Sequence, residues 1–499
     1  MFRLMLLSLF CVVSALSDNP NVILIYVDDM GYGDASCQNP QSKFQTPNID
    51  RLAKEGMSFT DGHSSDTVCT PSRYGLLTGR YSWRTTMKRG VMGAEGVCLI
   101  TDERMTLASF LRDKGYTTGM VGKWHLGMDF PGTKGNRDWS KPTVDTPLDK
   151  GFDYFWGIPA SMNYGMLAWF EGRMAKVPPI LFTRKKSNQI AVDDYRIKPP
   201  YQDKPVKPND LEVAKDFIDV VWLDRFTKQA IKWLNRQAKA ARKGKPFMLY
   251  LSHTSPHKPV IPLKRFRGKG KAGAYGEFMI ETDWQVGRVL DWLDKNKLAD
   301  NTVVIFTSDN GPESTWRRRI KEFKHHSNGI YREGKRSIYE GGHRVPFIVR
   351  WPNKVKAGSK WDLPVCQTDF LATFADMLGK ELPENAGEDS VSFYRALIGQ
   401  IVPQRLAMIH HSMRGRYAVR EGNWKLIMES GSKDSKRELY NLSVDPGELS
   451  NLIVKHPNVA KRLKKSITEI IRNGRTTPGR AQKNDTTLWN DLHWMIDLD

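Results

Sequence analysis

Oxygen-bearing side chains follow two apolar stretches of the sequence. Asp28 and Asp29 come directly after "NVILIYV", and Asp309 and Asn310 come directly after "NTVVIFTS". Carboxylate and amide oxygens are hard ligands that suit Ca²⁺ or Mg²⁺ better than zinc or copper. A single Asp-Asp pair after a strand is more often a turn or a helix cap. The match with a second strand end favours one metal site formed by all four residues.

Basic side chains follow two further apolar stretches. Lys123 and His125 come after "TTGMVG", while His253 and then His257 follow "PFMLYLS". Lys335 lies in the glycine-bounded segment "YREGKRSIYEGG". Each residue alone could be an ordinary surface or packed residue, but lysines and histidines around a divalent cation describe a pocket for a tetrahedral oxyanion. Because ligands bind at the carboxyl ends of strands in open parallel sheets, we expect one site there.

Cys69 lies in "SSDTVCTPSRYGLLTGR", at the start of a predicted helix. An isolated cysteine is usually a buried small hydrophobic residue. A tyrosine-phosphatase loop is excluded because three residues, rather than five, separate Cys69 from Arg73, and the sequence context of a papain-like cysteine is absent. Arg73 follows one helical turn later, and the helix N-terminus adds positive potential near position 69. An anion-handling nucleophile would fit there, although a plain thiol is an odd choice beside a hard cation.

The order of apolar and amphipathic segments predicts the scaffold that positions these residues. Strand-like runs alternate with helix-like segments such as "TPNIDRLAKEG" and "MTLASFLRDKG" over the N-terminal two thirds of the chain. This alternation predicts an α/β fold, with a large, mostly parallel (mixed) sheet sandwiched by helices. Residues 131–210 lack a clear period and are predicted to form long loops over one end of the sheet. Near residue 400 the pattern changes, which predicts a smaller C-terminal subdomain containing an antiparallel sheet and a helix.

The first residues, "MFRLMLLSLFCVVSALS", have the features of a secretory signal peptide. They contain one early arginine, an apolar run too short to span a bilayer and a small-residue end. We therefore expect a signal peptide at 1–17, a catalytic α/β domain at 18–400 and a C-terminal subdomain at 401–499. The mature protein is expected to have no transmembrane segment and to be secreted or periplasmic. Its few cysteines allow at most one or two disulfides, and none has the spacing of a zinc site.

The formal net charge of +21 over 499 residues would concentrate polyanions near the protein. The sequence has no signature of a nucleic-acid recognition fold, so we expect no nucleic-acid partner. A secreted enzyme that acts on an anionic polysaccharide fits the same charge. The alternative is that the basic side chains are simply solvated and bind no particular partner.

The segment "CTPSRYGLLTGR" resembles the signature of the formylglycine-dependent sulfatases, Cys-x-Pro-x-Arg followed by a Leu-Thr-Gly element. The resemblance continues in order through "NVILIYVDDMGYGD", "GYTTGMVGKWHLG", "TSPHKP", "IFTSDNG" and "GKRSIYEGGHRVPFIVRWP". The C-terminal features "YAVREGNWKLI" and "DPGELSNL" look like those of arylsulfatase A and N-acetylgalactosamine-6-sulfatase relatives, in the alkaline phosphatase superfamily. The resemblance implies a sulfuric ester hydrolase.

The same resemblance implies a role for each candidate residue. Cys69 would be converted to formylglycine (3-oxoalanine) by a formylglycine-generating or sulfatase-maturating enzyme, and its hydrated aldehyde would attack sulfur. The implied ligands of a Ca²⁺ ion are Asp28, Asp29, Asp309, Asn310 and residue 69.

The remaining implied roles concern charge and proton transfer. Arg73 would hold the formylglycine geometry, and Lys123 and Lys335 would balance charge on the sulfate. His125 would be the partner of the aldehyde hydrate, and His257 would help to protonate the leaving oxygen. His253 is a weaker candidate for the role of His257.

The substrate is expected to be a sulfated polysaccharide or oligosaccharide. The candidate contacts are the clusters at 264–271 and 317–321, the loop 161–166, Trp316, His325 and His326. A formylglycine-dependent phosphodiesterase or phosphonate hydrolase is the alternative activity, and a non-enzymatic protein that binds sulfated glycans is the alternative of a different class.

Overall fold

The computed structural model describes residues 19–184, 197, 199–403, 405–431, 435–487 and 489–498. The predicted signal peptide lies outside the described residues. In the described part of the chain, no helix combines the length and the apolar character needed to cross a membrane. The described cysteines, Cys37, Cys69, Cys98 and Cys366, form no disulfide.

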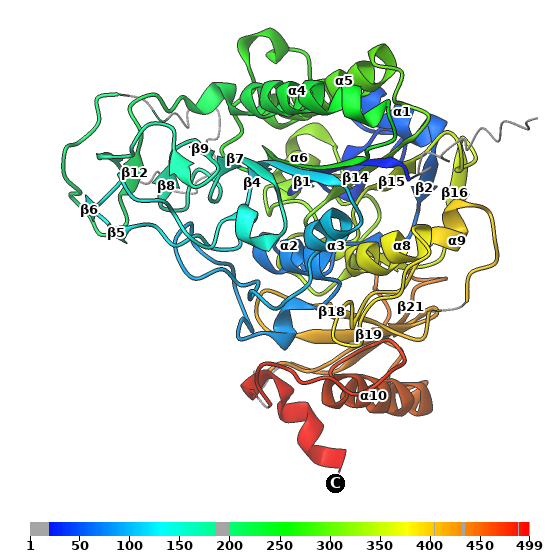
Figure 1. Cartoon of the computed structure of the whole chain (residues 1–499). Coiled ribbons are helices and arrows are strands. Elements are labelled where there is room, and N and C mark those ends of the chain that lie inside the picture. Colours follow the sequence, from blue (N-terminus) through cyan, green and yellow to red (C-terminus); the bar gives the residue numbers. More distant parts are fainter. Residues whose placement is uncertain are drawn as a thin grey trace, which may run out of the picture.

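A ten-stranded mixed sheet lies at the centre of the molecule (Figure 1). Its strands are, in spatial order, β10 (Met174–Ala175), β9 (Phe170–Glu171), β7 (Tyr154–Ile158), β4 (Thr117–Lys123), β13 (Phe247–Pro256), β1 (Asn21–Asp28), β14 (Thr302–Ser308), β15 (Phe347–Arg350), β2 (Met57–Phe59) and β16 (Ser359–Trp361). The central strands β7, β4, β13, β1 and β14 run parallel to one another, and β15 is antiparallel to β14. Every residue of β1, β13 and β14 is buried, which explains their near-continuous apolar sequences.

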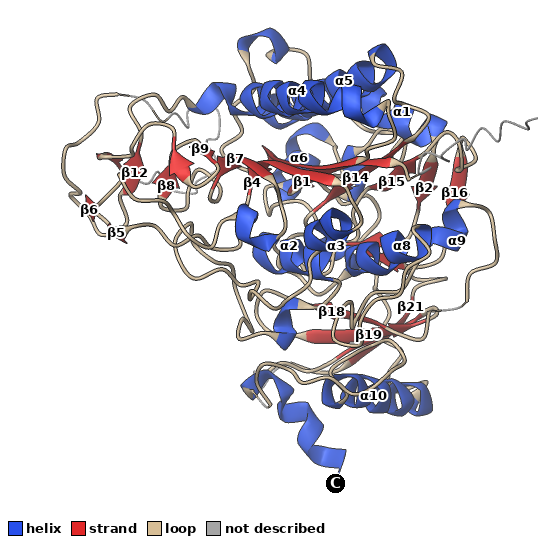
Figure 2. Ribbon diagram, in the orientation of Figure 1, coloured by secondary structure: helices blue, strands red, loops and turns tan. Residues whose placement is uncertain are grey.

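Helices cover both faces of this sheet (Figures 1 and 2). One face carries α1 (Pro47–Glu55), α4 (Trp222–Ala241) and α5 (Gly273–Lys295), and the other carries α2 (Cys69–Thr78), α3 (Leu107–Asp113) and α8 (Phe370–Met377). Three further helices are α6 (Trp316–Phe323), α7 (Glu340–His343) and α9 (Tyr394–Leu397). Helix α1 begins at Pro47 and ends before Gly56, as its sequence signals indicate. The predicted α/β fold with a mixed sheet between helices is confirmed.

A second sheet lies on the far side of the layer formed by α2, α3 and α8 (Figure 1). It is antiparallel and consists of β18 (Met408–His411), β19 (Tyr417–Glu421), β20 (Trp424–Ile427) and β21 (Glu438–Asn441). Helix α10 (Pro457–Arg472) packs on this sheet. Their shared apolar core also includes Tyr81 and Trp83, which follow α2 in the chain. The predicted C-terminal antiparallel sheet and helix are confirmed, and the boundary at residue 400 stays a prediction.

The expectation that residues 131–210 form only loops was wrong. This stretch also contains β5 (Gly132–Thr133), β6 (Asn136–Arg137), β8 (Met166–Leu167) and β11 (Leu181–Thr183), and β12 (Leu211–Val213), which pairs with β8 and β11, follows directly after it. The pair β3 (Gly62–His63) and β17 (Val365–Cys366) lies elsewhere. More importantly, β7 extends the parallel part of the main sheet beside β4. A Cβ atom on Gly157 would lie 1.9 Å from the carbonyl oxygen of Gly122, so the close approach of the two strands requires glycine at position 157. A strand of five residues that contains glycine gives little periodic signal.

Candidate functional site

Four neighbouring parallel strands end at the same edge of the main sheet. Asp28 and Lys123 are the last residues of β1 and β4, Asp309 follows β14, and His257 follows β13. All four side chains are buried. The structure therefore brings together residues that are far apart in the sequence, at the sheet edge where parallel strands present ligand sites.

The acidic side of this edge has two buried oxygen atoms that lack partners. The backbone N–H of Asp29 donates to Asp309 Oδ1 at 3.1 Å, and Asn310 Nδ2 donates to Asp29 Oδ1 at 2.8 Å. Asp29 Oδ2 and Asn310 Oδ1 are buried and have no hydrogen-bond partner among the described residues. Burial and the nearby Asp28 carboxylate raise the pKa of Asp309 to about 7. Crowded carboxylates and unpaired buried oxygens are what a hard divalent cation would satisfy.

Two lysines neutralise part of this negative charge. Lys123 Nζ donates to Asp28 Oδ2 at 2.6 Å, and Lys335 Nζ donates to Asp29 Oδ1. Although burial opposes it, Lys123 holds the pKa of Asp28 well below its usual range. In the same way, Asp29 raises the pKa of Lys335 against the effect of burial. Lys335 is therefore charged at neutral pH, directly beside the carboxylate of Asp29.

Cys69 is the first residue of α2, and it lies between the carboxylate of Asp28 and the ammonium group of Lys335. Its Sγ is 3.5 Å from Asp28 Oδ1 and 3.4 Å from Lys335 Nζ, and the residue is only 1% exposed. Burial and Asp28 raise the pKa of the thiol to about 12. The unmodified side chain therefore stays protonated at neutral pH and is a poor nucleophile.

Arg73 connects the helix that begins at Cys69 to three strands. Its Nη2 donates to Asp309 Oδ2 at 2.8 Å, and its Nη1 donates to Ser252 Oγ at 2.5 Å and to the carbonyl of Lys123 at 3.2 Å. The side chain is fully buried. Ser252 was not among the sequence candidates, because a serine inside an apolar strand gives no distinguishing pattern.

His125 has one ring nitrogen bonded and one without a partner. Its Nε2 lies 2.9 Å from the carbonyl of Met92, and its buried Nδ1 has no partner among the described residues. Because a carbonyl can only accept, Nε2 carries the proton and Nδ1 has a free lone pair. Burial and Lys123 hold the pKa of His125 well below its usual range. The ring of Tyr164 packs against it, with 4.8 Å between centroids.

The two histidines of the β13 region have different surroundings. His257 Nδ1 lies 2.6 Å from the carbonyl of Lys258, and its Nε2 faces Asp29 Oδ2 at 3.8 Å. Burial lowers its pKa to about 4. His253 instead packs against Phe226 of α4, and neither ring nitrogen has a partner among the described residues. The structure therefore places His257, and not His253, at the acidic cluster.

The predicted substrate contacts are only partly accessible. His325 is fully buried and its Nε2 bonds to Asp34 Oδ1 at 2.8 Å, so the expectation that it contacts a sugar was wrong. Trp316 is half-buried against the loop at Gly334, whereas His326 is exposed. In the cluster 317–321, Arg319 is buried and bonded to Ser327 Oγ. In the loop 161–166, Tyr164 reaches the site through its contact with His125.

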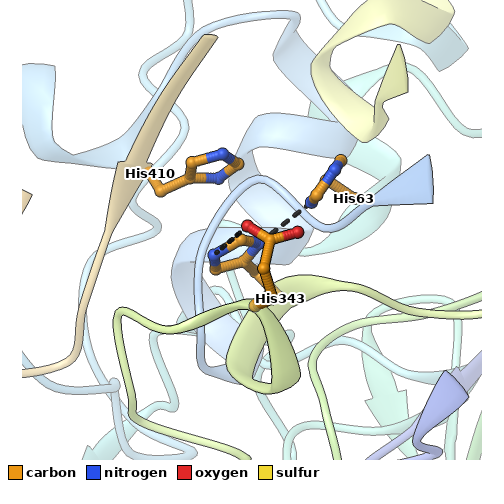
Figure 3. Close-up of side chains that lie close together, drawn as sticks. His63, His343 and His410 are labelled. Carbon is orange, nitrogen blue, oxygen red and sulfur yellow. Dashed lines mark hydrogen bonds and ion pairs between the residues drawn. The ribbon is translucent and has the colours of Figure 1, made fainter. Parts of the chain in front are cut away.

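A second group of buried histidines lies between the main sheet and the C-terminal sheet. Figure 3 shows His63, His343 and His410 with their rings close together. His63 Nδ1 lies 2.9 Å from His343 Nδ1, and the ring of His410 stacks on His343 with 3.9 Å between centroids. Together with Glu340, these residues have the composition of a metal site.

A lysine already supplies positive charge to this histidine group. Lys425 Nζ lies 2.9 Å from Glu340 Oε1 and 3.2 Å from His343 Nε2. At the other end, His63 Nε2 bonds to Asp61 Oδ1 at 2.6 Å. A proton on each donor gives a continuous chain from Lys425 through both histidines to Asp61. The group therefore serves as a polar link between β3, α7 and the C-terminal sheet.

Comparison with known proteins gives consistent matches over nearly the whole chain. The model of the Sulfatase family matches residues 20–380, and that of the N-sulphoglucosamine sulphohydrolase C-terminal region matches residues 329–473. The N-acetylgalactosamine-6-O-sulfatase of Bacteroides thetaiotaomicron is 34% identical, covering 91% of this chain and 93% of that protein. Arylsulfatase A of Homo sapiens is 31% identical, covering 88% of this chain and 84% of that protein. A solved sulfatase from the metabolism of multiple glycosaminoglycans by Bacteroides thetaiotaomicron superposes with a TM-score of 0.79 at 32% identity, covering 91% of this chain and 99% of that one.

Proposed function

The chain belongs to the sulfatase family and is a sulfuric ester hydrolase, and we propose that it removes sulfate from a sulfated carbohydrate by means of Ca²⁺ and a formylglycine at position 69. The observation that carries this proposal is the convergence of Asp28 and Asp29 on the buried N-terminus of α2, where Cys69 lies beside Lys335.

The acidic cluster fits a calcium ion. Asp28, Asp29, Asp309 and Asn310 would hold it, and the unpaired oxygens of Asp29 and Asn310 support this assignment. When bound, the ion supplies positive charge to the sulfate group and to the side chain at position 69. Lys123 and Lys335 would then be released from part of their pairing with the carboxylates and could face the sulfate oxygens.

The chemistry at position 69 requires more than a thiol. Because the pKa of Cys69 is raised to about 12, the cysteine itself would be protonated and inert. Formylglycine would supply an oxygen nucleophile at this position. The positive charges of Lys335, Lys123 and Arg73 surround the place where negative charge would develop on the sulfate.

The two site histidines are suited to opposite proton transfers. His125 donates from Nε2 to the carbonyl of Met92, so its Nδ1 would accept a proton from residue 69. His257 donates from Nδ1 to the carbonyl of Lys258, so its Nε2 would carry the proton that the leaving oxygen takes. An anionic sulfate beside His257 would raise its pKa from about 4 and favour the protonated form.

The similar proteins and the charge of the chain support a carbohydrate substrate. A relative of 34% identity is named an N-acetylgalactosamine-6-O-sulfatase, and the solved structure of 32% identity comes from glycosaminoglycan metabolism. The net charge of +21 favours capture of a polyanion. From the N-terminal sequence we also propose that the protein is secreted or periplasmic.

Hydrolysis of 4-nitrophenyl sulfate by protein produced together with a sulfatase-maturating enzyme tests the proposal. The mass of the peptide that contains residue 69 should show formylglycine, and activity should scale with the modified fraction. The Cys69→Ala variant should be inactive. Full activity of that variant, or activity in protein whose Cys69 is entirely unmodified, would contradict the mechanism. A 4-nitrophenyl phosphonate monoester, tested in parallel, should be the poorer substrate.

A further inference from the structure

A cavity of about 300 Å³ lies beside the proposed catalytic centre. Its lining residues come from four segments of the chain, namely 93–95, 130–137, 163–166 and 208–212. Phe130 and Tyr164 contribute aromatic rings to the lining. The remaining polar side chains are either charged or carry an amide group. A volume of this size is at the lower end of small-molecule sites, which suits a single sugar ring.

The cavity adjoins the reacting groups through His125. Tyr164, which lines the cavity, packs on the ring of His125 with 4.8 Å between the ring centroids. The residues from Gly93 onward follow directly after Met92, whose carbonyl binds His125. A molecule whose sulfate lies at position 69 would therefore extend into this cavity.

The cavity contains a buried amide oxygen that is available for a ligand. Asn163 is only 5% exposed, and its Oδ1 has no hydrogen-bond partner in the described part of the chain. An unpaired buried acceptor is costly, so a donor from a ligand or from water would satisfy it. A sugar hydroxyl or N-acetyl N–H is a donor of this kind.

The lining of the cavity has three carboxylates, those of Glu95, Asp210 and Glu212, and two cations, so its net charge is negative in a protein whose net charge is +21. Arg137 lies between two carboxylates, with Nε 2.9 Å from Glu212 and Nη2 2.8 Å from Glu95. One guanidinium therefore faces two negative charges. Lys134, the other cation of the lining, is engaged by the backbone carbonyls of Pro208 and Asp210. A second sulfate or a uronate placed here would be repelled by the carboxylates, whereas hydroxyl groups would find acceptors.

We propose that this cavity is a subsite for one hexopyranose ring whose only anionic group is the sulfate ester that is cleaved. Asn163 and Glu95 accept hydrogen bonds from the ring substituents, and Tyr164 packs on its apolar face. The inference rests on the proposed sulfatase function and adds the class of sugar to it. The basic surface gathers sulfated chains, and the acidic subsite selects a singly sulfated unit at the reacting position.

Substrate pairs that differ by one sulfate provide the test. A set of hexoses and N-acetylhexosamines, each with one sulfate at a different position, identifies the monosulfate with the highest kcat/KM. This sugar is then compared with a disulfated sugar that retains the same cleavable sulfate. We expect the wild-type kcat/KM for the monosulfate to exceed that for the disulfate by about tenfold or more. Equal or faster turnover of the disulfate would overturn the inference.

Two variants connect this preference to the cavity, with 4-nitrophenyl sulfate as the reference substrate. Asn163→Ala should lower kcat/KM for the monosulfated sugar, relative to the aryl sulfate, by about tenfold. Glu95→Gln should narrow the preference for the monosulfate over the disulfate. Glu103→Gln, at an exposed glutamate outside the cavity, should change neither ratio. Unaltered ratios in both cavity variants, with unchanged thermal unfolding, would overturn the inference.

The reference substrate separates this inference from the proposed function. Turnover of 4-nitrophenyl sulfate without turnover of any monosulfated sugar would refute the subsite alone. Absence of turnover even for the aryl sulfate, in formylglycine-containing protein, would refute the proposed function and the subsite together.

Discussion

Arg73 and Asp309 form an ion pair in which neither side chain is exposed, with 2.8 Å between Nη2 and Oδ2. The pair connects α2, one turn after its first residue Cys69, to the residue that follows β14. It therefore fixes the position of residue 69 relative to the acidic cluster. Removal of one partner would leave the other charge buried without compensation.

A double-mutant cycle on this pair should separate stability from catalysis. Arg73→Met should lower the free energy of unfolding by about 3–5 kcal/mol, because Asp309 loses its buried counter-ion. Adding Asp309→Asn to that variant should restore part of the stability but none of the sulfatase activity. Denaturant unfolding and 4-nitrophenyl sulfate turnover measure the two quantities. If the loss of stability in the double variant equals the sum of the losses in the two single variants, the ion pair does not couple the two positions.

Removal of calcium should lower both activity and thermal stability. Without the ion, Asp28, Asp29 and Asp309 face one another in a buried site, so ligand binding should stabilise the folded state. Ca²⁺ at 100 times its Kd would add about 2.7 kcal/mol to the metal-free protein. Differential scanning calorimetry before and after a chelator, and after re-addition of Ca²⁺, measures the effect.

The matched variants for the calcium experiment are Asp29→Asn and Asp113→Asn. Asp29→Asn should weaken the stabilisation by Ca²⁺, whereas Asp113→Asn changes an exposed aspartate on α3 and should respond like the wild type. A metal-stripped wild-type protein whose Tm does not respond to Ca²⁺ would refute the assignment.

The two histidines of the β13 region should differ in their effect on catalysis. His257→Gln should lower kcat about 10²–10⁴-fold for a sugar sulfate, because the leaving alkoxide needs a proton. The loss should be smaller for 4-nitrophenyl sulfate, whose phenolate leaves without help. His253→Gln should retain nearly full kcat on both substrates, because His253 packs against Phe226 away from the acidic cluster. Equal losses in the two variants would contradict this division.

His253 should instead make the protein sensitive to acid. Burial lowers its pKa to about 3, below the value of about 6.5 for an unfolded chain. Between these values the unfolded state binds a proton that the folded state does not, so stability is lost as the pH falls below about 6.5. At pH 5 this loss amounts to about 2 kcal/mol.

Variants at two histidines check this pH dependence by urea unfolding at pH 5 and pH 7.5. His253→Leu should reduce the difference in unfolding free energy between the two pH values by about 2 kcal/mol. His326→Leu, at an exposed histidine, should leave the difference unchanged. An unaltered difference in His253→Leu would assign the acid sensitivity to other groups.

The sequence was sufficient to predict the alternation of strands and helices and the convergence of polar residues at one edge of the sheet. The buried strands β1, β13 and β14 are continuous apolar runs, so their carboxyl ends, and Asp28 and Asp309 with them, could be located from the pattern alone. The family motif then added Cys69, which no periodicity distinguishes.

Residues whose role depends on three-dimensional packing could not be predicted in this way. Strand β7 depends on the contact of Gly157 with Gly122, which only the folded sheet reveals. Ser252 gains its role from the guanidinium of Arg73, and His325 is removed from the surface by its bond to Asp34. In each case the partner is more than 30 positions away in the chain, so no local pattern contains the information.

The complete burial of α2 determines whether Cys69 can be modified before or after the chain folds. Cys69 is 1% exposed, and the segment before it is held by later parts of the protein, through the bonds of Asp66 to His411 and of Thr67 Oγ1 to the amide of Met413. A maturation enzyme could not reach the cysteine once the C-terminal sheet has closed over this segment. On the proposed mechanism, oxidation of Cys69 to formylglycine would have to compete with folding, and chains that fold first would remain inactive. The yield of active enzyme would depend on the host's speed of modification rather than on the stability of the finished protein.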